Sequence, residues 1–254
     1  MSDSQFHQKI LWINPVATDI FDKPMLEMFQ DVKAPFTRVD VVSFPPIGPK
    51  HLEYSCYEMM IMPELMKTVR RAEEQGYDAA VIGCFYDPAL RAAREVANKM
   101  VVTAPAESCL RLAATLGDTV SIIVGRRKWV PEMRENVHKY GYKDKLASFK
   151  VLGMGVHDFQ KDHEETKRQI LQAAQEAVEK DGAEVVVLGC TIEFGFYQEV
   201  QRRVGVPVLD ATIAPLKYAE YLIGLRNQFG WGHSKIAGFE APPEQEISEW
   251  SLFE

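Results

Sequence analysis

The stretch Glu73-Glu-Gln-Gly-Tyr-Asp-Ala-Ala-Val-Ile-Gly-Cys84 recurs without gaps as Glu179-Lys-Asp-Gly-Ala-Glu-Val-Val-Val-Leu-Gly-Cys190. At a constant offset of 106 residues, the copies share a Glu, a Gly, an acidic residue, a Val and a final Gly-Cys. Each copy reads as a helix end, a glycine turn and a short buried strand. An ordinary helix–turn–strand array would explain this order, but not why both strands end in Gly-Cys. The repeat therefore predicts two similar halves.

Strand and helix patterns alternate on both sides of this repeat. The predicted strands cover residues 10–13, 38–43, 79–83, 100–102, 120–124, 149–154, 184–189 and 206–209. The predicted helices cover 52–75, 88–98, 131–140, 162–180, 196–203 and about 213–226. Such alternation is typical of parallel sheets joined by crossover helices. We therefore expect an α/β fold with two pseudo-symmetric halves, each a mostly parallel sheet flanked by helices, and a site in the cleft between them. The structure of the tail from Trp231 is left open.

Composition and charge restrict the class of partner. The chain has 254 residues, and its formal net charge of −7 argues against a nucleic-acid surface or a basic membrane anchor. No segment approaches 18 uninterrupted apolar residues, and residues 1–9 lack the pattern of a signal peptide. We expect a cytoplasmic protein that acts on a small-molecule substrate, with no nucleic-acid or membrane partner. A homo-oligomer is one option that the sequence leaves open.

The four cysteines are Cys56, Cys84, Cys109 and Cys190. They form no CxxC pair, and the histidines show no metal-ligand spacing, so we expect no metal site. The sequence also lacks a P-loop and a GxGxxG fingerprint, so we expect no nucleotide cofactor. Cys56 and Cys109 are interpreted as core filling. Cys84 and Cys190 differ because each follows a strand, at the sheet edge where α/β proteins bind ligands.

Two thiols that approach one cleft from opposite sides suit a particular reaction. Racemisation needs two acid/base groups of matched pKa, one on each face of a carbon atom. Each cysteine is expected just before a helix, and a thiol at a helix N-terminus can have its pKa lowered from about 8.5 towards neutrality. Cys84 and Cys190 are therefore candidates for a thiolate base and a thiol acid that exchange roles when the reaction runs in reverse.

The sequence around both cysteines resembles a known superfamily. Val81-Ile-Gly-Cys-Phe-Tyr-Asp-Pro-Ala-Leu90 resembles the first cysteine motif of hydantoin and allantoin racemases, which belong to the aspartate/glutamate/hydantoin racemase superfamily. Val187-Leu-Gly-Cys-Thr191 resembles the second motif. Further similar segments are Ile13-Asn-Pro15, Ala104-Pro-Ala-Glu107, Val206-Pro-Val-Leu-Asp210 and the tail at Ser234-Lys235. The resemblance implies cofactor-independent racemisation by two cysteines and discontinuous domains, with 1–115 plus 211–254 as one half and 116–210 as the other.

Departures from the family pattern leave the substrate open. The usual Asn-Pro-Asn-Thr is here Asn14-Pro-Val-Ala-Thr18, and Tyr86 stands where a small or acidic residue is common. Cys190 is followed by Thr-Ile-Glu-Phe, whose Cys-Thr pair is similar to that of amino-acid racemases, in which the Thr helps to bind the substrate carboxylate. A 5-substituted hydantoin, allantoin and an amino acid all remain candidate substrates.

Six further residues are candidates for substrate binding, each with a structural alternative. Asn14 is a candidate donor to the developing oxyanion, or an ordinary cap of the turn before Pro15. Thr191 could offer its hydroxyl or its N–H to that oxygen, or serve a local turn. Asp87 could orient Cys84 or bind an imide nitrogen, but we prefer an ordinary helix start with Pro88. Glu107 could tune a thiol or simply occupy a first helical turn, and Phe85 and Tyr86 could wall a pocket or be core.

Three rival functions remain at this point. Two lie in the same superfamily: a cis–trans isomerase that uses cysteine as a nucleophile, and a decarboxylase that uses it as a proton donor. The third is a non-catalytic small-molecule-binding or accessory protein that keeps the fold.

Overall fold

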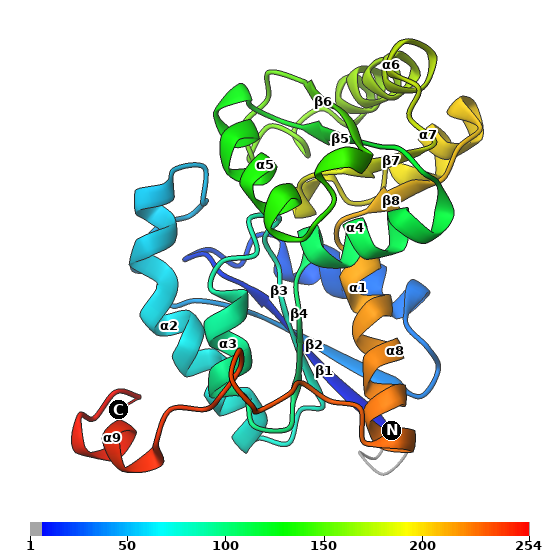
Figure 1. Ribbon diagram of the computed structural model, residues 1–254. Helices are drawn as coiled ribbons and strands as arrows, with labels where there is room; N and C mark the ends of the chain where they lie inside the picture. Colours follow the sequence, from blue (N-terminus) through cyan, green and yellow to red (C-terminus); the bar gives the residue numbers. More distant parts are fainter. Residues whose placement is uncertain (1–6, 254) are drawn as a thin grey trace. The chain divides into compact units, whose positions relative to one another are not determined.

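The computed structural model describes residues 7–253 (Figure 1), so most of the stretch in which a signal peptide was sought lies outside the described residues. The chain divides into two compact units. Of the described residues, the first contains 7–82, Pro88–Thr103 and 216–253. The second contains Gly83–Asp87 and Ala104–Pro215. No described helix is both long enough and apolar enough to cross a lipid bilayer.

The first unit is built on a four-stranded parallel sheet. Its strands are β1 (Gln8–Asn14), β2 (Thr37–Ser43), β3 (Ala79–Ile82) and β4 (Val101–Thr103), in the order β2-β1-β3-β4. Its helices are α1 (Asp22–Val32), α2 (Ser55–Glu74), α3 (Leu90–Val96) and most of α8 (Ile213–Phe229). Figure 1 shows α2 and α3 on one side of this sheet and α1 and α8 on the other. The Trp12 and Phe29 rings are fully buried with centroids 4.9 Å apart, so they pack β1 against α1.

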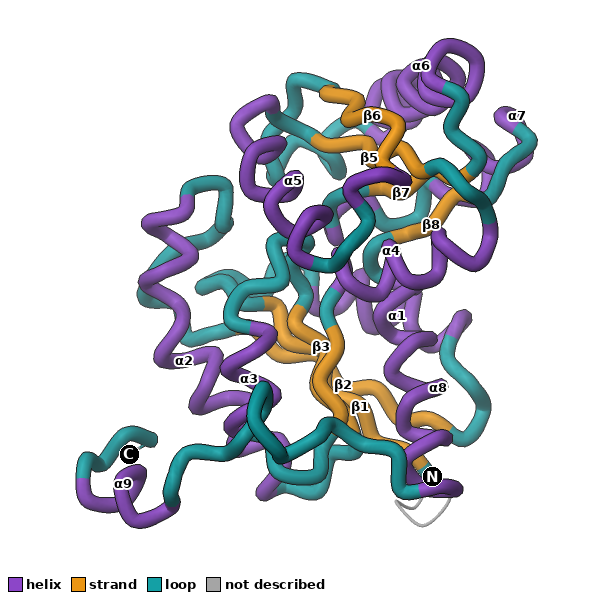
Figure 2. Tube along the Cα trace, viewed as in Figure 1, coloured by secondary structure: helices purple, strands orange, loops and turns teal. Residues whose placement is uncertain are grey.

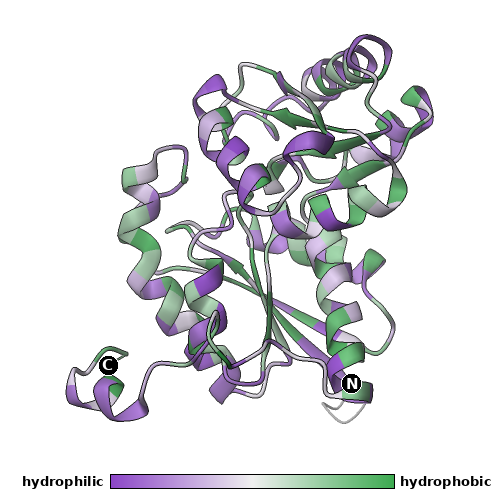
Figure 3. Cartoon of the chain, viewed as in Figure 1, coloured by the Kyte–Doolittle hydropathy of each residue, from purple (hydrophilic) through white to green (hydrophobic). Residues whose placement is uncertain are grey.

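The second unit repeats this plan. Its strands are β5 (Val120–Val124), β6 (Leu146–Val151), β7 (Val185–Leu188) and β8 (Val208–Asp210), in the order β6-β5-β7-β8 and all parallel. Its helices are α4 (Pro105–Leu116), α5 (Val130–Lys139), α6 (His163–Asp181) and α7 (Tyr197–Val204), with the short 3-10 turns η2 (Arg127–Trp129), η3 (Lys143–Lys145) and η4 (Thr191–Glu193). Helices lie on both faces of the sheet (Figure 2), and Figure 3 shows hydrophobic residues along its strands.

The internal repeat corresponds to equivalent strands. β3 and β7 start 106 residues apart, at Ala79 and Val185, and each is third in the order of its sheet. Both are completely buried, as expected for central strands of a parallel sheet covered on both faces. The predicted fold class, with two similar parallel α/β halves, is confirmed.

Several elements differ from the sequence prediction: the predicted helix ranges do not include α4, and the bounds of β1, α2 and β8 are shifted by a few residues. Three further differences have a clear physical reason or extent. Helix α1 was not predicted, because only Met25 and Phe29 of its eleven residues are buried and the apolar periodicity is short. Helix α3 begins at Leu90 instead of residue 88, because Asp87 and Ala89 both have a φ of 50° and form a turn. Strand β6 begins at Leu146, three residues before the predicted start.

The expected boundary at residue 115 placed α4 with the first half. In the structure α4 packs against β7 and β8, and it belongs to the second unit together with the five-residue turn that follows β3. The C-terminal segment lies on the first unit. There Val102 of edge strand β4 donates its N–H to His233 Nε2 at 2.9 Å, and the Lys235 ammonium donates to the carbonyls of Arg94 and Ala97 at the end of α3. A short helix, α9 (Glu244–Glu249), follows.

Candidate active site

Cys84 lies in the turn that follows β3. The Cys84 carbonyl accepts the N–H of Asp87 at 2.9 Å, which closes the turn. The Asn136 side chain donates to the Tyr86 carbonyl at 2.7 Å and fixes the turn against α5. Phe85 and Tyr86 are buried, whereas Cys84 is partly exposed. The turn therefore presents the thiol and buries the two aromatic side chains that follow it.

Asp87 anchors this turn to helix α4. Its Oδ1 accepts the N–H of Ala106 and its Oδ2 accepts the N–H of Glu107, both at 2.8 Å. The Tyr140 hydroxyl donates to Oδ2, also at 2.8 Å. The preferred prediction, a helix start with Pro88, is wrong, because Asp87 caps the first turn of α4 instead and leaves α3 uncapped.

The environment of Asp87 changes its acidity. Burial raises the pKa of the Asp87 carboxyl from 3.8 to about 7, although the hydrogen bonds from Ala106, Glu107 and Tyr140 oppose this rise. The nearby Glu107 carboxylate adds a smaller upward contribution. Glu107 itself is buried, and its carboxylate accepts a hydrogen bond of 2.8 Å from the Arg111 guanidinium, which forms an ion pair along α4. The connection between the Cys84 turn and α4 is therefore sensitive to pH near neutrality.

Cys190 lies in the corresponding turn after β7. The preceding Gly189 donates its N–H to the Ile123 carbonyl at 2.7 Å, and a Cβ at Gly189 would lie 2.7 Å from that oxygen. Only glycine fits so close to a neighbouring backbone, which gives the Gly-Cys motif a physical reason in this half. Cys190 is largely buried, and its carbonyl accepts the N–H of Glu193 at 3.0 Å, which forms η4.

The structure brings the two cysteine turns together. Thr191, directly after Cys190, donates its hydroxyl to the carbonyl of Gly83, directly before Cys84, at 3.1 Å. The Thr191 carbonyl in turn accepts the Thr212 hydroxyl at 2.8 Å. The hydroxyl proton of Thr191 is thus committed to Gly83, which leaves its backbone N–H as the group able to donate to a substrate oxygen.

Two buried acids lie behind Cys190, and the sequence analysis missed both. Asp210, at the end of β8, accepts the N–H groups of Thr212 at 2.8 Å and Gly195 at 3.2 Å. Burial raises its pKa, while these backbone donors act against the rise. Glu193 has no exposed surface, and its carboxyl lies near the N–H of Cys190 without a hydrogen bond of normal geometry. Burial, together with Asp210, holds the pKa of Glu193 well above its usual range, because both disfavour the charged carboxylate.

Asn14 is the last residue of β1, in the first unit. It is buried, its Oδ1 accepts the Trp12 indole N–H at 2.7 Å, and its Nδ2 donates to Asp22 at 2.6 Å. The preceding residue, Ile13, is the register partner of Ile82, two residues before Cys84 in the chain. Asn14 therefore lies at the same edge of the first sheet as the end of β3.

All four cysteines are described, and none forms a disulfide. Cys109 is buried as predicted, and burial, with Asp210 and Asp87 nearby, raises the pKa of its thiol well above the ordinary value. The core-filling prediction is wrong for Cys56, which is exposed in the first turn of α2. The expected position just before a helix is also wrong for Cys84 and Cys190, because α3 begins at Leu90 and only a 3-10 turn follows Cys190.

Comparison with known proteins gives a consistent result. A family model described as Asp/Glu/Hydantoin racemase matches residues 10–219. A hydantoin racemase from Pseudomonas sp. (strain NS671) is 33% identical over 238 residues, covering 94% of this chain and 93% of that protein. A hydantoin racemase from Paenarthrobacter aurescens is 34% identical over 243 residues, covering 94% and 99%. The solved structure of allantoin racemase from Klebsiella pneumoniae aligns with a TM-score of 0.86 at 27% identity, over 93% of this chain and 94% of that one.

Proposed function

We propose a specific reaction for this chain, which belongs to the Asp/Glu/Hydantoin racemase family and is a racemase. The chain inverts the configuration of a carbon atom that carries an acidic C–H beside a carbonyl in a small molecule. The reaction uses no cofactor. The resemblance expected from the cysteine motifs is confirmed by the family match. A 5-substituted hydantoin and allantoin are the first substrates to test, because the similar proteins are named hydantoin and allantoin racemases.

The proposed mechanism uses Cys84 and Cys190 as two bases. The thiolate of one cysteine takes the proton from the substrate carbon, and the electron pair of the broken C–H bond moves into the adjacent carbonyl to form an enolate. The thiol of the other cysteine then donates its proton to the opposite face and becomes a thiolate. The observation that carries this proposal is the hydrogen bond from Thr191 to Gly83, which joins the two cysteine turns.

The remaining candidate residues receive supporting roles in this proposal. The backbone N–H of Thr191 and the side chain of Asn14 donate to the developing enolate oxygen. Phe85 and Tyr86 supply an apolar wall beside Cys84. Asp87 already accepts three hydrogen bonds, so we assign it to holding the Cys84 turn rather than to binding the substrate. Glu107 supports this arrangement through its backbone N–H.

The test compares single-cysteine variants on both enantiomers of allantoin and of 5-benzylhydantoin. Loss of optical activity is followed by polarimetry, and exchange of the α-proton by NMR in D₂O. Cys84→Ser and Cys190→Ser should each lower the rate of racemisation by at least a factor of about 10² to 10⁴, the usual contribution of a general acid or base. Cys56→Ser is the matched control, because its thiol is exposed on α2, and it should keep the wild-type rate. Full activity in either active-site variant would contradict the two-base proposal.

A further inference from the structure

A chain of hydrogen bonds between side chains surrounds Asn14 in the first unit. The Trp12 indole N–H, in a fully buried ring, donates to Asn14 Oδ1 at 2.7 Å. Asn14 Nδ2 donates to Asp22 Oδ1 at 2.6 Å, and the same Asp22 oxygen accepts the Ser43 hydroxyl, also at 2.6 Å. The chain thus joins the end of β1, the first turn of α1 and the end of β2.

The chemistry of the two ends fixes which way the Asn14 amide points. An indole N–H can only donate, and a carboxylate can only accept, so the oxygen of Asn14 must face Trp12 and its nitrogen must face Asp22. The reversed amide would place N–H against N–H at one end and oxygen against oxygen at the other. Both contacts would be repulsive in a buried site, where unpaired polar groups are costly. Asn14 is therefore held in one orientation.

In this orientation, Asn14 can make one further kind of hydrogen bond. The amide oxygen is occupied by Trp12, and one of the two Nδ2 hydrogens is occupied by Asp22. The second Nδ2 hydrogen has no protein acceptor among residues 7–253. Asn14 can accordingly donate one hydrogen bond to a ligand, and it can neither accept a proton nor receive a hydrogen bond from a ligand N–H through its nitrogen.

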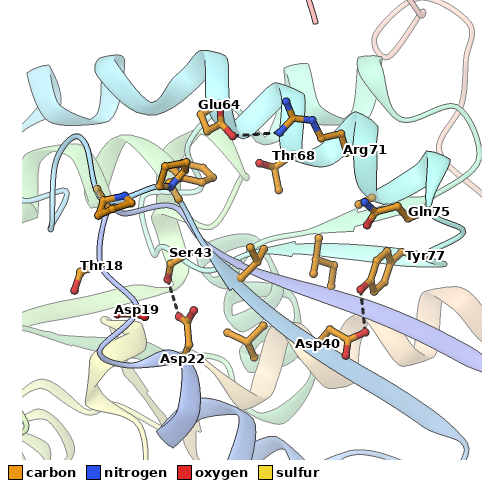
Figure 4. A pocket seen from close by; sticks show the side chains of 18 residues that line it. Thr18, Asp19, Asp22, Asp40, Ser43, Glu64, Thr68, Arg71, Gln75 and Tyr77 are labelled. Carbon is orange, nitrogen blue, oxygen red and sulfur yellow. Dashed lines mark hydrogen bonds and ion pairs between the residues drawn. The ribbon is translucent and has the colours of Figure 1, made fainter. Parts of the chain in front are cut away.

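Asp22 is the residue that holds the Asn14 amide in this orientation. It lies in the first turn of α1, where the helix dipole favours a carboxylate. Figure 4 shows Asp22 and Ser43 pointing towards each other at the wall of a pocket of about 700 Å³ beside α2. Thr68 of α2 and Gln75, directly after that helix, line the same pocket and make no contact with Asn14 in the hydrogen-bond network described above. The pocket gives solvent a route to Asp22 but not to the buried indole of Trp12.

We propose that Trp12, Asp22 and Ser43 are positioning residues that hold Asn14 so that it can only donate a hydrogen bond to the substrate. The substrate group that contacts Asn14 is then an acceptor oxygen. This inference rests on the proposed function and makes it more specific. The accepted compounds carry a carbonyl or carboxylate oxygen at this position, and compounds that present an N–H there are rejected. Asp22 and Trp12 touch no reacting atom in this scheme and act only through Asn14.

The decisive test exchanges the two partners of the central hydrogen bond. In Asn14→Asp, two carboxylates face each other, so both the melting temperature and the racemisation rate should fall. In the double variant Asn14→Asp with Asp22→Asn, the amide introduced on α1 donates to the carboxylate introduced at the end of β1, and that carboxylate still accepts from Trp12. The double variant should therefore regain most of the lost melting temperature and remain slower than wild type by a factor of about 10² to 10³, the usual cost of losing one oxyanion donor. Recovery of the rate together with the stability would overturn the inference, because it would make Asn14 merely structural.

Single variants separate positioning from folding. Asp22→Asn keeps an acceptor oxygen for Asn14 and should retain a rate close to wild type, whereas Asp22→Ala should lower kcat by about tenfold or more and leave the pH profile of the cysteines unchanged. Thr68→Ala, in the same pocket, is the matched control and should have no effect. An Asp22→Ala variant with unchanged kcat would contradict the inference.

A readout independent of activity distinguishes failure of this inference from failure of the proposed function. In ¹⁵N–¹H spectra, the side-chain signals of Asn14 are identified by their loss in Asn14→Asp. The hydrogen bonded to Asp22 should resonate downfield of its geminal partner and should move upfield in Asp22→Ala. If wild-type protein racemises nothing but shows this pattern, the orientation stands and the proposed reaction falls. If the two hydrogens resemble those of an exposed asparagine, the orientation itself is wrong.

Discussion

Asp87 provides a quantitative prediction about stability and pH. Its carboxyl is 3% exposed, and its pKa is raised from 3.8 to about 7 in the folded protein by burial. Between these values the folded protein keeps a proton that the unfolded chain has lost. The stability contributed by protonated Asp87 is therefore fully present below pH 3.8 and is lost as the pH rises through about 7. The difference between 3.8 and about 7 corresponds to about 4 kcal/mol.

The assay measures the free energy of unfolding by urea denaturation from pH 4 to pH 8, for wild type and for Asp87→Asn. The variant cannot titrate at this position, so the wild-type value minus the variant value should fall by about 4 kcal/mol from pH 4 to above pH 7. Acids that do not interact with Asp87 contribute equally to both proteins and cancel in the difference, and Glu107 accounts for only a smaller part of the Asp87 shift. Tyr140→Phe removes a hydrogen bond that lowers the pKa of Asp87, so it should extend the fall to higher pH. Parallel curves for wild type and Asp87→Asn would refute the reasoning.

Variants at three further positions test the turn around Cys190. Because burial disfavours the charged form of Glu193, Glu193→Gln, which places a neutral group of similar volume there, should leave stability within about 1 kcal/mol. Glu193→Ala should lose about 2 kcal/mol or more in thermal denaturation. Equal losses in the two variants would contradict this reasoning. Thr191→Val removes the hydrogen bond to Gly83 and should cost about 1 kcal/mol of stability but more than tenfold in racemisation rate, and an unchanged rate would count against the coupling of the turns. Gly189→Ala should destabilise by about 1 to 3 kcal/mol, because its Cβ would lie 2.7 Å from a backbone oxygen, whereas Gly224→Ala on α8 meets nothing within 4 Å and should not destabilise.

The sequence predicts most of the fold because the fold is repetitive. The strands of the repeat are short, fully apolar and bounded by glycine, and both copies occupy the same place in their sheets. Helix α1 escaped prediction because only Met25 and Phe29 mark its buried face. Cys56 was misread because its helix is rich in methionine, although Met59 and Met60 are in fact exposed.

Side-chain roles that depend on distant contacts could not be predicted. Asp87 caps α4, whose first residues lie about twenty positions further along the chain. No local sequence pattern predicts such a contact. Glu193 stands in an apolar stretch, but its raised pKa depends on burial beside Asp210, at the end of β8. The partner of Asn14 lies in the helix that was missed, so its fixed orientation became visible only in the structure.

The central claim is that two separate thiols act on opposite faces of one carbon. It is tested most directly by incubating one enantiomer of 5-benzylhydantoin with the wild-type enzyme in D₂O and analysing both enantiomers at low conversion. Two bases predict that the newly formed enantiomer carries deuterium while the recovered starting enantiomer keeps its proton, because the proton is taken by one cysteine and replaced from the other. If both enantiomers acquire deuterium at the same rate, or if the product retains the original proton, a single base acts on both faces and the account is contradicted.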